Sequence, residues 1–317
     1  MILKQEILAA LERSPDAPLS GQALAQQFGV SRSAVWKAVN ALKREGYEIS
    51  SATNRGYRLE KDSDRLSADR LAADLGETLP VRVFRSLDST NNEAKRLLAG
   101  GMRCPFLVAA DEQTGGRGRS GHAFYSPAGA GLYMSLAMAP GAALTEALRI
   151  TAYAAVCTAQ AIEMLTDRSC GIKWVNDLYL DGKKVCGILT EAITDFESGS
   201  VDAVVIGIGV NLHPAEVPAE LREIVGFLDA PPVKNKLAAE ITRRLLRFDA
   251  RQTEFVAEYR RRSTVLGKKV QFDSDGRTAE GVAAEIDDSG ALLVQTADGR
   301  SAVLRSGTVR VIENGAE

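Results

Sequence analysis

A polar, glycine-rich stretch limits how this chain can fold more than any other part of its sequence. Residues 111–121 read DEQTGGRGRSG, with four glycines and two arginines but no apolar side chain. Apolar runs of strand length, Phe106–Ala110 and Leu132–Ala137, precede and follow this stretch. Because the stretch has nothing to bury, we expect a long loop between two core strands. Long polar loops of this kind are usually functional or disordered.

The residue types in this loop are those of an anion-binding clamp. Gly116 and Gly118 let the backbone approach a ligand and adopt left-handed conformations. Arg117 and Arg119 supply planar, permanently charged groups that fit phosphate or carboxylate. We therefore interpret residues 111–121 as a loop that orders on an anionic ligand. Taken alone, the loop leaves open the alternative of a solvated connection without a role.

Charge and cysteine content exclude several classes of protein. The net charge of −2 over 317 residues gives no general basic excess, so a DNA-binding surface has to be local. The four cysteines form no C-x-x-C pair, and there are only two histidines, so no metal site is expected. Reduced cysteines and an N-terminus without a signal-peptide pattern predict a cytoplasmic protein. No apolar run approaches the roughly 18 residues that span a bilayer, so no membrane association is expected.

Residues 1–62 have the pattern of a winged helix-turn-helix domain. Apolar residues recur at helical spacing from Ile2 to Leu11. Ser20 and Ser31 are suited to cap a second and a third helix, which a tight Gly-Val-Ser turn joins. Two short strands, Tyr47–Ser51 and Gly56–Leu59, follow as the wing.

The start of the third helix is the part of this motif that enters a DNA major groove. Residues 1–60 contain eight basic and six acidic residues, a local net charge of +2, so binding would depend on placement more than on bulk charge. A winged helix that contacts another protein is the alternative. The predicted DNA-binding residues are Ser31, Arg32, Ser33, Trp36 and Lys37 on the helix, with Arg55 and Arg58 on the wing.

The remaining chain divides into a mixed domain, residues 63–264, and a β domain, residues 265–317. In the first, strands cluster with few βαβ alternations, which favours an α+β sheet-and-helix arrangement over a doubly wound fold. In the second, strands alternate with turn pairs such as Ser289-Gly290, which predicts a small SH3-like β-barrel. The helices expected in the mixed domain are Asn92–Ala99, Leu144–Leu165, 235–247 and 250–262, and the strands are Val81–Phe84, Phe106–Ala110, Leu132–Ala137, Gly171–Trp174, Val185–Ala192 and Val201–Val210.

Three further segments of the mixed domain have residue types suited to a ligand site. Ser89-Thr90-Asn91 lies between a strand and a helix, where it could cap the helix or bind a polar group. Lys184 directly precedes an apolar strand, so its ammonium group could face a cavity, although such lysines are usually solvated. The pair Gly207 and Gly209 gives a strand with bare backbone against which a flat ligand could pack.

In their order and spacing these segments resemble the biotin protein ligases. The matching strings are Ser89-Thr90-Asn91, Gly116-Arg117-Gly118-Arg119, Lys173-Trp174-x-Asn176-Asp177 and Lys184-x-x-Gly187-Ile188. With the N-terminal winged helix-turn-helix, the chain resembles the bifunctional type, a ligase that also represses biotin genes. The resemblance covers essentially the whole chain. The family often has proline where Val175 stands, and basic and tryptophan residues where His122-Ala123-Phe124 stands.

The resemblance implies a role for each matched residue. Catalytic roles fall to Lys184, Arg117, Arg119 and Asp177, the last as the candidate general base. Biotin binding falls to Ser89, Thr90, Asn91, Gln113, Arg117, Gly118, Arg119, Lys184, Gly187, Gly207 and Gly209, and nucleotide binding to Arg119, Lys173, Trp174, Asn176 and Asn211.

The resemblance also implies a reaction and partners. Biotin and ATP, with Mg²⁺, would form biotinyl-5′-AMP, and a lysine of a biotin carboxyl carrier protein would then take up the biotin. Because two anions must meet, such a site needs cations, which Lys184 and the arginines supply. Operator DNA and a ligand-promoted homodimer are the other implied partners. A ligand-responsive transcription factor without catalysis and a lipoate-type ligase are the alternatives.

Overall fold

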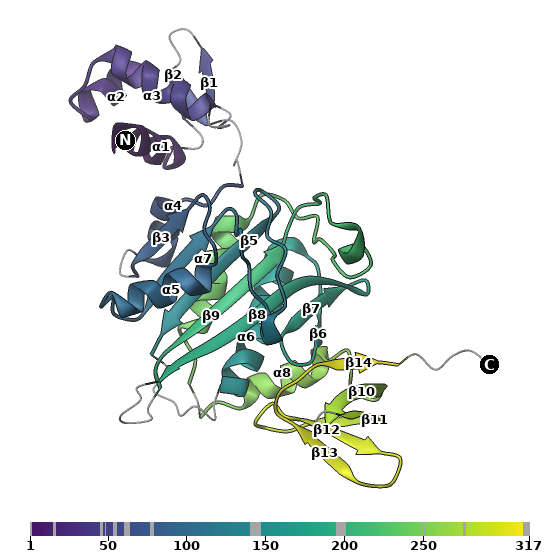
Figure 1. Cartoon of the computed structure of the whole chain (residues 1–317). Helices are drawn as coiled ribbons and strands as arrows, with labels where there is room; N and C mark the ends of the chain where they lie inside the picture. Colours follow the sequence, from purple (N-terminus) through teal and green to yellow (C-terminus); the bar gives the residue numbers. More distant parts are fainter. Residues whose placement is uncertain are drawn as a thin grey trace.

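Three structural units follow one another along the chain (Figure 1). The computed structural model describes residues 2–14, 17–44, 47, 49–52, 56–59, 64–76, 79–139, 147–194, 201–249, 251–274 and 277–312. None of the helices in these ranges is long and apolar enough to cross a membrane.

The N-terminal unit is the predicted winged helix-turn-helix. Its elements are α1 (Ile2–Glu12), α2 (Gly21–Gln27), α3 (Arg32–Arg44), β1 (Ile49–Ala52) and β2 (Gly56–Leu59). The predicted caps are present, because Ser20 Oγ accepts from the Ala23 amide at 3.0 Å and Ser31 Oγ accepts from the Ala34 amide at 3.2 Å. Leu11, Leu24 and Val39 belong to its own small core. This unit therefore has the local signals and the separate core of a domain.

The central unit is built on a seven-stranded sheet in the order β3-β4-β5-β9-β8-β7-β6. Strands β3 and β4 are parallel, and every other neighbouring pair is antiparallel. The mixed sheet confirms the expected α+β class. The strands are β3 (Val81–Phe84), β4 (Phe106–Ala110), β5 (Gly131–Met138), β6 (Gly171–Lys173), β7 (Asp177–Leu180), β8 (Lys183–Thr194) and β9 (Val201–Asn211).

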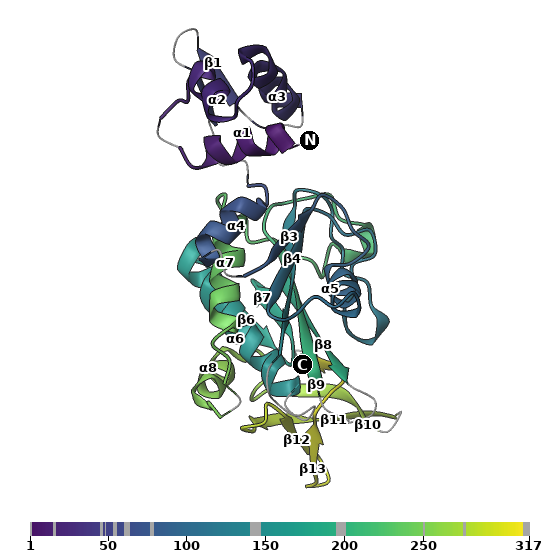
Figure 2. The ribbon, with the colours of Figure 1, turned by 90° about the vertical axis from the view of Figure 1, so that its left-hand side faces the viewer.

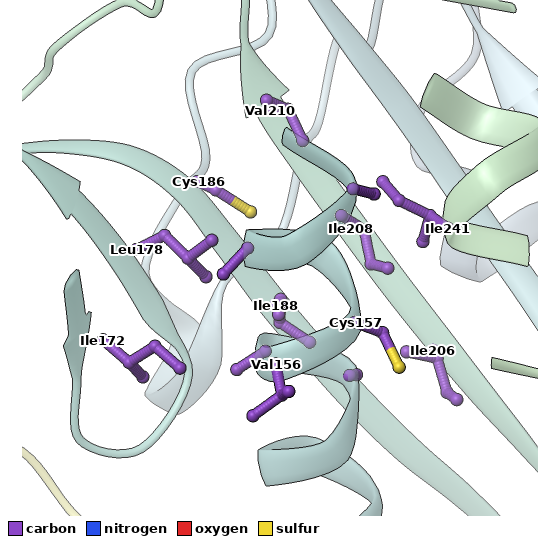
Figure 3. Close-up of a cluster of buried hydrophobic side chains, with 14 of the residues drawn as sticks. Val156, Cys157, Ile172, Leu178, Cys186, Ile188, Ile206, Ile208, Val210 and Ile241 are labelled. Carbon is purple, nitrogen blue, oxygen red and sulfur yellow. The ribbon is translucent and has the colours of Figure 1, made fainter. Parts of the chain in front are cut away.

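Helices cover both faces of this sheet (Figure 2). The larger core lies on the face covered by α4 (Ala68–Leu75), α6 (Ala147–Thr166), α7 (Lys234–Leu245) and α8 (Glu254–Arg262). Figure 3 shows Val156 and Cys157 of α6 packed with Ile188, Ile206 and Ile208 of the sheet. The other face carries α5 (Thr90–Ala99), which packs through Ala94 on Phe106 and Val205.

The C-terminal unit is a five-stranded antiparallel sheet in the order β13-β12-β11-β10-β14. Its buried side chains join the central core, and the indole Nε1 of Trp174 donates to the Gly290 carbonyl oxygen at 3.0 Å. The SH3-like β class expected for this unit is confirmed. The strands are β10 (Lys269–Ser274), β11 (Arg277–Ile286), β12 (Leu292–Thr296), β13 (Ser301–Leu304) and β14 (Val309–Val311).

Several expected bounds differ from the structure. Helix α4 and strand β7 were not expected, because α4 is only eight residues long and β7 is four residues long with an irregular register to β8. Helix α6 extends to Thr166, and its expected first residues fall outside the described ranges. The strand expected over Gly171–Trp174 ends at Lys173, and the helix expected over 250–262 begins at Glu254.

Candidate active site

One cavity of about 200 Å³ collects nearly all the predicted ligase residues. It lies over the β9-β8-β7-β6 half of the sheet and is lined by the start of α5, the glycine–arginine loop, and parts of these strands. The predicted residues that line it are Ser89, Thr90, Asn91, Gln113, Arg117, Gly118, Arg119, Lys173, Trp174, Asn176, Asp177, Lys184, Gly187, Gly207 and Gly209. Residues from four segments far apart in the sequence therefore meet at one place.

Asn211 is the predicted site residue that does not line this cavity. Its Nδ2 donates to the carbonyl oxygens of Lys184 at 3.4 Å and Gly226 at 3.1 Å. Asn211 therefore supports the backbone of Lys184 from behind. Trp174 lines the cavity but is buried, and its indole N–H points to the C-terminal unit.

One end of the cavity is neutral and lined by hydrogen-bonding groups. Ser89 stands at the N-cap position of α5 but makes no side-chain capping bond, so its hydroxyl is not used as a cap. The Thr90 amide donates to Gln113 Oε1 at 2.8 Å. Ser135 of β5, fully buried, places its hydroxyl 2.6 Å from Asn91 Oδ1. This end suits a ligand that is polar and uncharged.

The other end gathers cations around a single carboxylate. Lys184 Nζ lies 2.8 Å from Asp177 Oδ1, so the two side chains form an ion pair. This oxygen is buried, and the contact does not have the geometry of a hydrogen bond. Burial lowers the pKa of Lys173. The negative charge of Asp177 raises this pKa, and the positive charge of Lys184 lowers it further. Burial likewise lowers the pKa of the Arg119 guanidinium, again opposed by Asp177. Three positive side chains and one negative one give this end the charge that attracts an anion.

The glycine–arginine loop is folded as a small hairpin beside the cavity. The Gly118 amide donates to the His122 carbonyl oxygen at 2.7 Å, and the Phe124 amide donates to that of Gly116 at 2.9 Å. A Cβ at Gly116 would lie 2.4 Å from the Phe124 carbonyl oxygen, so this glycine is required by the hairpin itself.

The two arginines of the loop make different contacts. Arg117 Nη1 donates to Asn92 Oδ1 at 3.1 Å and lies 3.9 Å from Glu191 Oε1. Arg119 Nη1 donates to Asn176 Oδ1 at 3.4 Å, toward the cationic end. Arg117 therefore ties the loop to α5 and β8, while Arg119 closes it over the side of the cavity that also holds Lys184.

Glycines leave space for side chains of the chain itself on the sheet surface. A Cβ at Gly209 would lie 2.4 Å from the Phe124 ring, and one at Gly207 would lie 2.2 Å from Asn91 Oδ1. Lys184 Nζ is 6.0 Å from the centre of the Phe124 ring. A ring of the chain itself thus packs on the bare backbone at Gly209, where a flat ligand was expected.

The sequence interpretation did not include Phe124, Ser135 or the segment Gly307–Val309 among the site residues. Phe124 lies at one of the positions that depart from the family pattern, and a serine inside the apolar run of β5 was a signal that could have been used. The C-terminal segment carries no such signal, because it reaches the cavity through packing of the C-terminal unit on the central core.

The predicted DNA-binding residues on α3 are exposed. Arg32, Ser33, Trp36 and Lys37 are exposed, Trp36 to 58%, while Val35 and Val39 face the core. Arg58 lies on β2, and Arg55 falls outside the described residues. A large exposed aromatic beside two cations is consistent with a nucleic-acid surface.

Comparisons with known proteins match each unit separately. Residues 83–211 match the Biotin/lipoate A/B protein ligase family, residues 4–58 match an HTH domain, and residues 265–313 match the Biotin protein ligase C terminal domain.

Relatives match over most of the chain as well. The Bifunctional ligase/repressor BirA of Bacillus subtilis is 33% identical over 94% of this chain and 95% of its own length. The Biotin--[acetyl-CoA-carboxylase] ligase of Mycobacterium tuberculosis is 30% identical over 72% of this chain and 87% of its own length. A solved structure of biotin protein ligase from Aquifex aeolicus, in complex with biotin and ATP, superimposes with a TM-score of 0.62 at 26% identity, covering 74% of this chain and 99% of that one. The chain therefore belongs to the biotin protein ligase family, in the group of bifunctional ligases and repressors.

Proposed function

We propose that this protein joins biotin to ATP, forming biotinyl-5′-AMP, and transfers the biotin to a lysine of a biotin carboxyl carrier protein. The observation that carries the proposal is the division of one cavity into a neutral hydrogen-bonding end and a cationic end. Biotin has the same division, since a neutral ureido ring lies at one end of the molecule and a carboxylate at the other.

The cationic end supports the first step. The biotin carboxylate attacks the α-phosphate of ATP, a bond forms between carboxylate oxygen and phosphorus, and pyrophosphate leaves. Two anions approach each other in this step, so positive charge lowers its barrier. Lys184 and Lys173 line the cationic end, and we propose that Lys184 provides this charge while Lys173 contacts the nucleotide. Magnesium would arrive with the ATP as part of the substrate.

Closure of the glycine–arginine loop would protect the intermediate from water. Biotinyl-5′-AMP is a mixed anhydride that water hydrolyses, so the site must exclude solvent until the acceptor arrives. Arg119 reaches Asn176 across the cavity edge, which is the contact a closing loop needs. The acceptor lysine then attacks the acyl carbon and AMP leaves. Asp177 is the carboxylate in the cavity and our candidate for accepting the proton of that lysine.

The neutral end separates biotin from lipoate. Thr90, Asn91 and Gln113 provide hydrogen-bonding groups there, and these match a ureido ring. The dithiolane ring of lipoate offers no N–H or carbonyl group, so it would leave those groups without partners. A biotin-dependent exchange of pyrophosphate into ATP tests the proposal directly. Exchange with biotin but not lipoate is the expected result, and folded protein that catalyses no biotin-dependent exchange would contradict it.

The N-terminal unit adds repression of biotin genes to the proposal. The exposed start of α3 carries Arg32 and Lys37, which suit a major groove. Such domains read two half-sites about one helical turn apart, so we propose that a ligand-promoted homodimer binds a palindromic operator. A ligand-binding repressor without catalysis would need neither Lys184 at the cavity nor an arginine loop over it, which is why we favour the bifunctional assignment.

A further inference from the structure

A carboxylate behind the cavity is bonded to two side chains of α5. Glu191 lies on β8, outside the set of residues that line the cavity. Its Oε1 accepts from Lys95 Nζ at 2.9 Å, and its Oε2 accepts from Asn91 Nδ2 at 2.8 Å. We propose that Glu191 is a positioning residue that fixes which atoms at the neutral end of the cavity accept hydrogen bonds, so that this end selects a ligand that donates N–H groups. The inference rests on the proposed function, since biotin is the ligand concerned.

Glu191 fixes the orientation of the Asn91 side-chain amide. Burial favours the neutral form of Glu191, but hydrogen bonds from Asn91 and Lys95 hold its pKa below the usual range. Glu191 is therefore a carboxylate, which only accepts hydrogen bonds. Asn91 must turn its NH₂ group toward Glu191, and the Leu189 carbonyl oxygen accepts from the same group at 3.3 Å. The amide oxygen Oδ1 consequently faces Ser135.

The orientation of Asn91 decides where the hydroxyl hydrogens of Ser135 and Thr90 point. Ser135 Oγ lies 2.6 Å from Asn91 Oδ1 and 2.7 Å from Thr90 Oγ1. A hydroxyl has one hydrogen, and Asn91 Oδ1 can only accept, so the Ser135 hydrogen points to Asn91. The contact between Ser135 and Thr90 has the length of an O–H···O hydrogen bond, which then requires the hydrogen of Thr90.

Two hydrogen-bond acceptors, Thr90 Oγ1 and Gln113 Oε1, come together at the cavity wall. Gln113 Nε2 donates to Ser126 Oγ at 3.0 Å, and Gln113 Oε1 accepts from the Thr90 amide, so the orientation of Gln113 is set independently. Thr90 Oγ1 lies 3.1 Å from Gln113 Oε1, but its hydrogen already points to Ser135. Both residues line the cavity, so these two oxygens are the acceptors that they can offer to a ligand there. A ligand N–H between them is favourable, and a ligand oxygen in the same place is repelled.

Lys95 makes this arrangement reversible by mutation. The ammonium group of Lys95 can only donate hydrogen bonds. In Glu191→Gln it therefore binds the one amide oxygen of the glutamine. The glutamine NH₂ group is then left facing Asn91. Asn91 turns its own oxygen toward it and gives up the longer bond, 3.3 Å, to the Leu189 carbonyl oxygen. Ser135 receives a hydrogen from Asn91 and gives its own to Thr90. The Thr90 hydrogen can then point to Gln113 Oε1, 3.1 Å away, so the pair of free acceptors that prefers a ligand N–H is lost. In Lys95→Met/Glu191→Gln the ammonium group is gone, and Arg117 Nη1, 3.9 Å from Oε1 of Glu191, is already bonded to Asn92. The glutamine oxygen can therefore face Asn91, and the original direction returns.

The experiment measures binding by calorimetry to the full-length protein, without ATP. The ligands are biotin and its two cyclic carbamate analogues, in each of which one ring N–H is replaced by oxygen. We expect the unmutated protein to bind biotin at least about 10-fold more tightly than one of the analogues, because a site built to accept from N–H rejects an oxygen. Lys95→Met should keep this ratio, Glu191→Gln should lose most of it, and the double variant should recover it.

The ratio separates positioning from a merely structural role. If Glu191→Gln weakens all three ligands equally and leaves the ratio unchanged, the proposal is wrong. It is also wrong if the unmutated protein binds biotin but distinguishes neither analogue. Should Glu191→Gln not fold, Ser135→Ala tests the same step, since it frees the Thr90 hydrogen and should lower the ratio; an unchanged ratio there overturns the proposal. Absence of biotin binding by the unmutated protein would contradict the proposed function itself.

Discussion

Replacing Gly207 by alanine should damage biotin binding through a single steric conflict. The new Cβ would lie 2.2 Å from Asn91 Oδ1 and 2.8 Å from its Cγ. The first of these distances is more than about 1 Å inside the optimal separation of roughly 3.5 Å for non-bonded heavy atoms. Asn91 cannot move away at little cost, because Ser135, Glu191 and the Leu189 carbonyl hold it.

The magnitude follows from what must give way. Overpacking a filled interior costs about 1–3 kcal/mol, and each buried polar group that loses its partner costs about 1–3 kcal/mol more. With one lost partner, we expect Gly207→Ala to lower the free energy of unfolding by about 2–6 kcal/mol, and at about 2–4 °C per kcal/mol the Tm should fall by roughly 4–24 °C. Displacement of Asn91 also disturbs the neutral end of the cavity, so the Kd for biotin should rise by about 10- to 100-fold.

Calorimetric scanning and biotin titration measure these two quantities. Gly100→Ala is a matched control, because Gly100 has a φ of −79° and the nearest atoms to its new Cβ would be 3.4 Å away. Gly209→Ala places a Cβ 2.4 Å from the Phe124 ring, which stands on a loop and can swing aside, so its Tm should fall less. A Gly207→Ala protein with the Tm and biotin affinity of Gly100→Ala would refute the steric argument.

Three other outcomes can be checked with standard assays. Lys184→Ala should reduce biotinyl-5′-AMP formation by at least about 100-fold, because it removes a charge that offsets repulsion between two anions; near-normal pyrophosphate exchange would make this lysine a surface residue. Arg119→Gly should still form the adenylate but release it, because the contact of the loop with Asn176 is lost, and mass spectrometry of added albumin would then find biotinylated lysines; modification confined to the carrier protein would argue against this. Arg32→Ala should weaken binding to the operator without changing ligase rates, and footprinting upstream of biotin genes should show protection that increases with biotin and ATP; protection independent of both would remove the coupling between the two activities.

Local signals in the sequence were enough to predict much of the fold. Ser20 and Ser31 are both caps, and the apolar runs of β4, β5 and β9 are strands close to their expected bounds. These elements have a strong periodic or capping pattern of their own. Strand β7 has no such pattern, since only Leu178 of its four residues is fully buried, and pairing with β6 and β8 decides its conformation.

In the candidate site, too, some residues could be predicted from the sequence and others depend on how the chain packs. The predicted ligase residues other than Asn211 all line one cavity, and Asn211 stands behind it. Sequence could not predict that Thr308 of the C-terminal unit would line the same cavity, because that depends on how two sheets pack. It also could not predict that Ser135 would lie between Thr90 and Asn91, because β5 and α5 meet only in the folded chain.

The two ends of this chain differ in how far they can be exchanged in evolution or by design. The N-terminal unit has its own core and meets the central unit through contacts such as Ser67 Oγ to Glu12 Oε2 at 2.9 Å and Arg65 over the Tyr47 ring at 4.8 Å. The C-terminal unit shares the central core, receives the Trp174 indole bond and supplies part of the cavity wall. A different DNA reader could therefore replace the first unit by simple fusion, whereas a transplanted C-terminal unit would have to be redesigned together with the catalytic sheet.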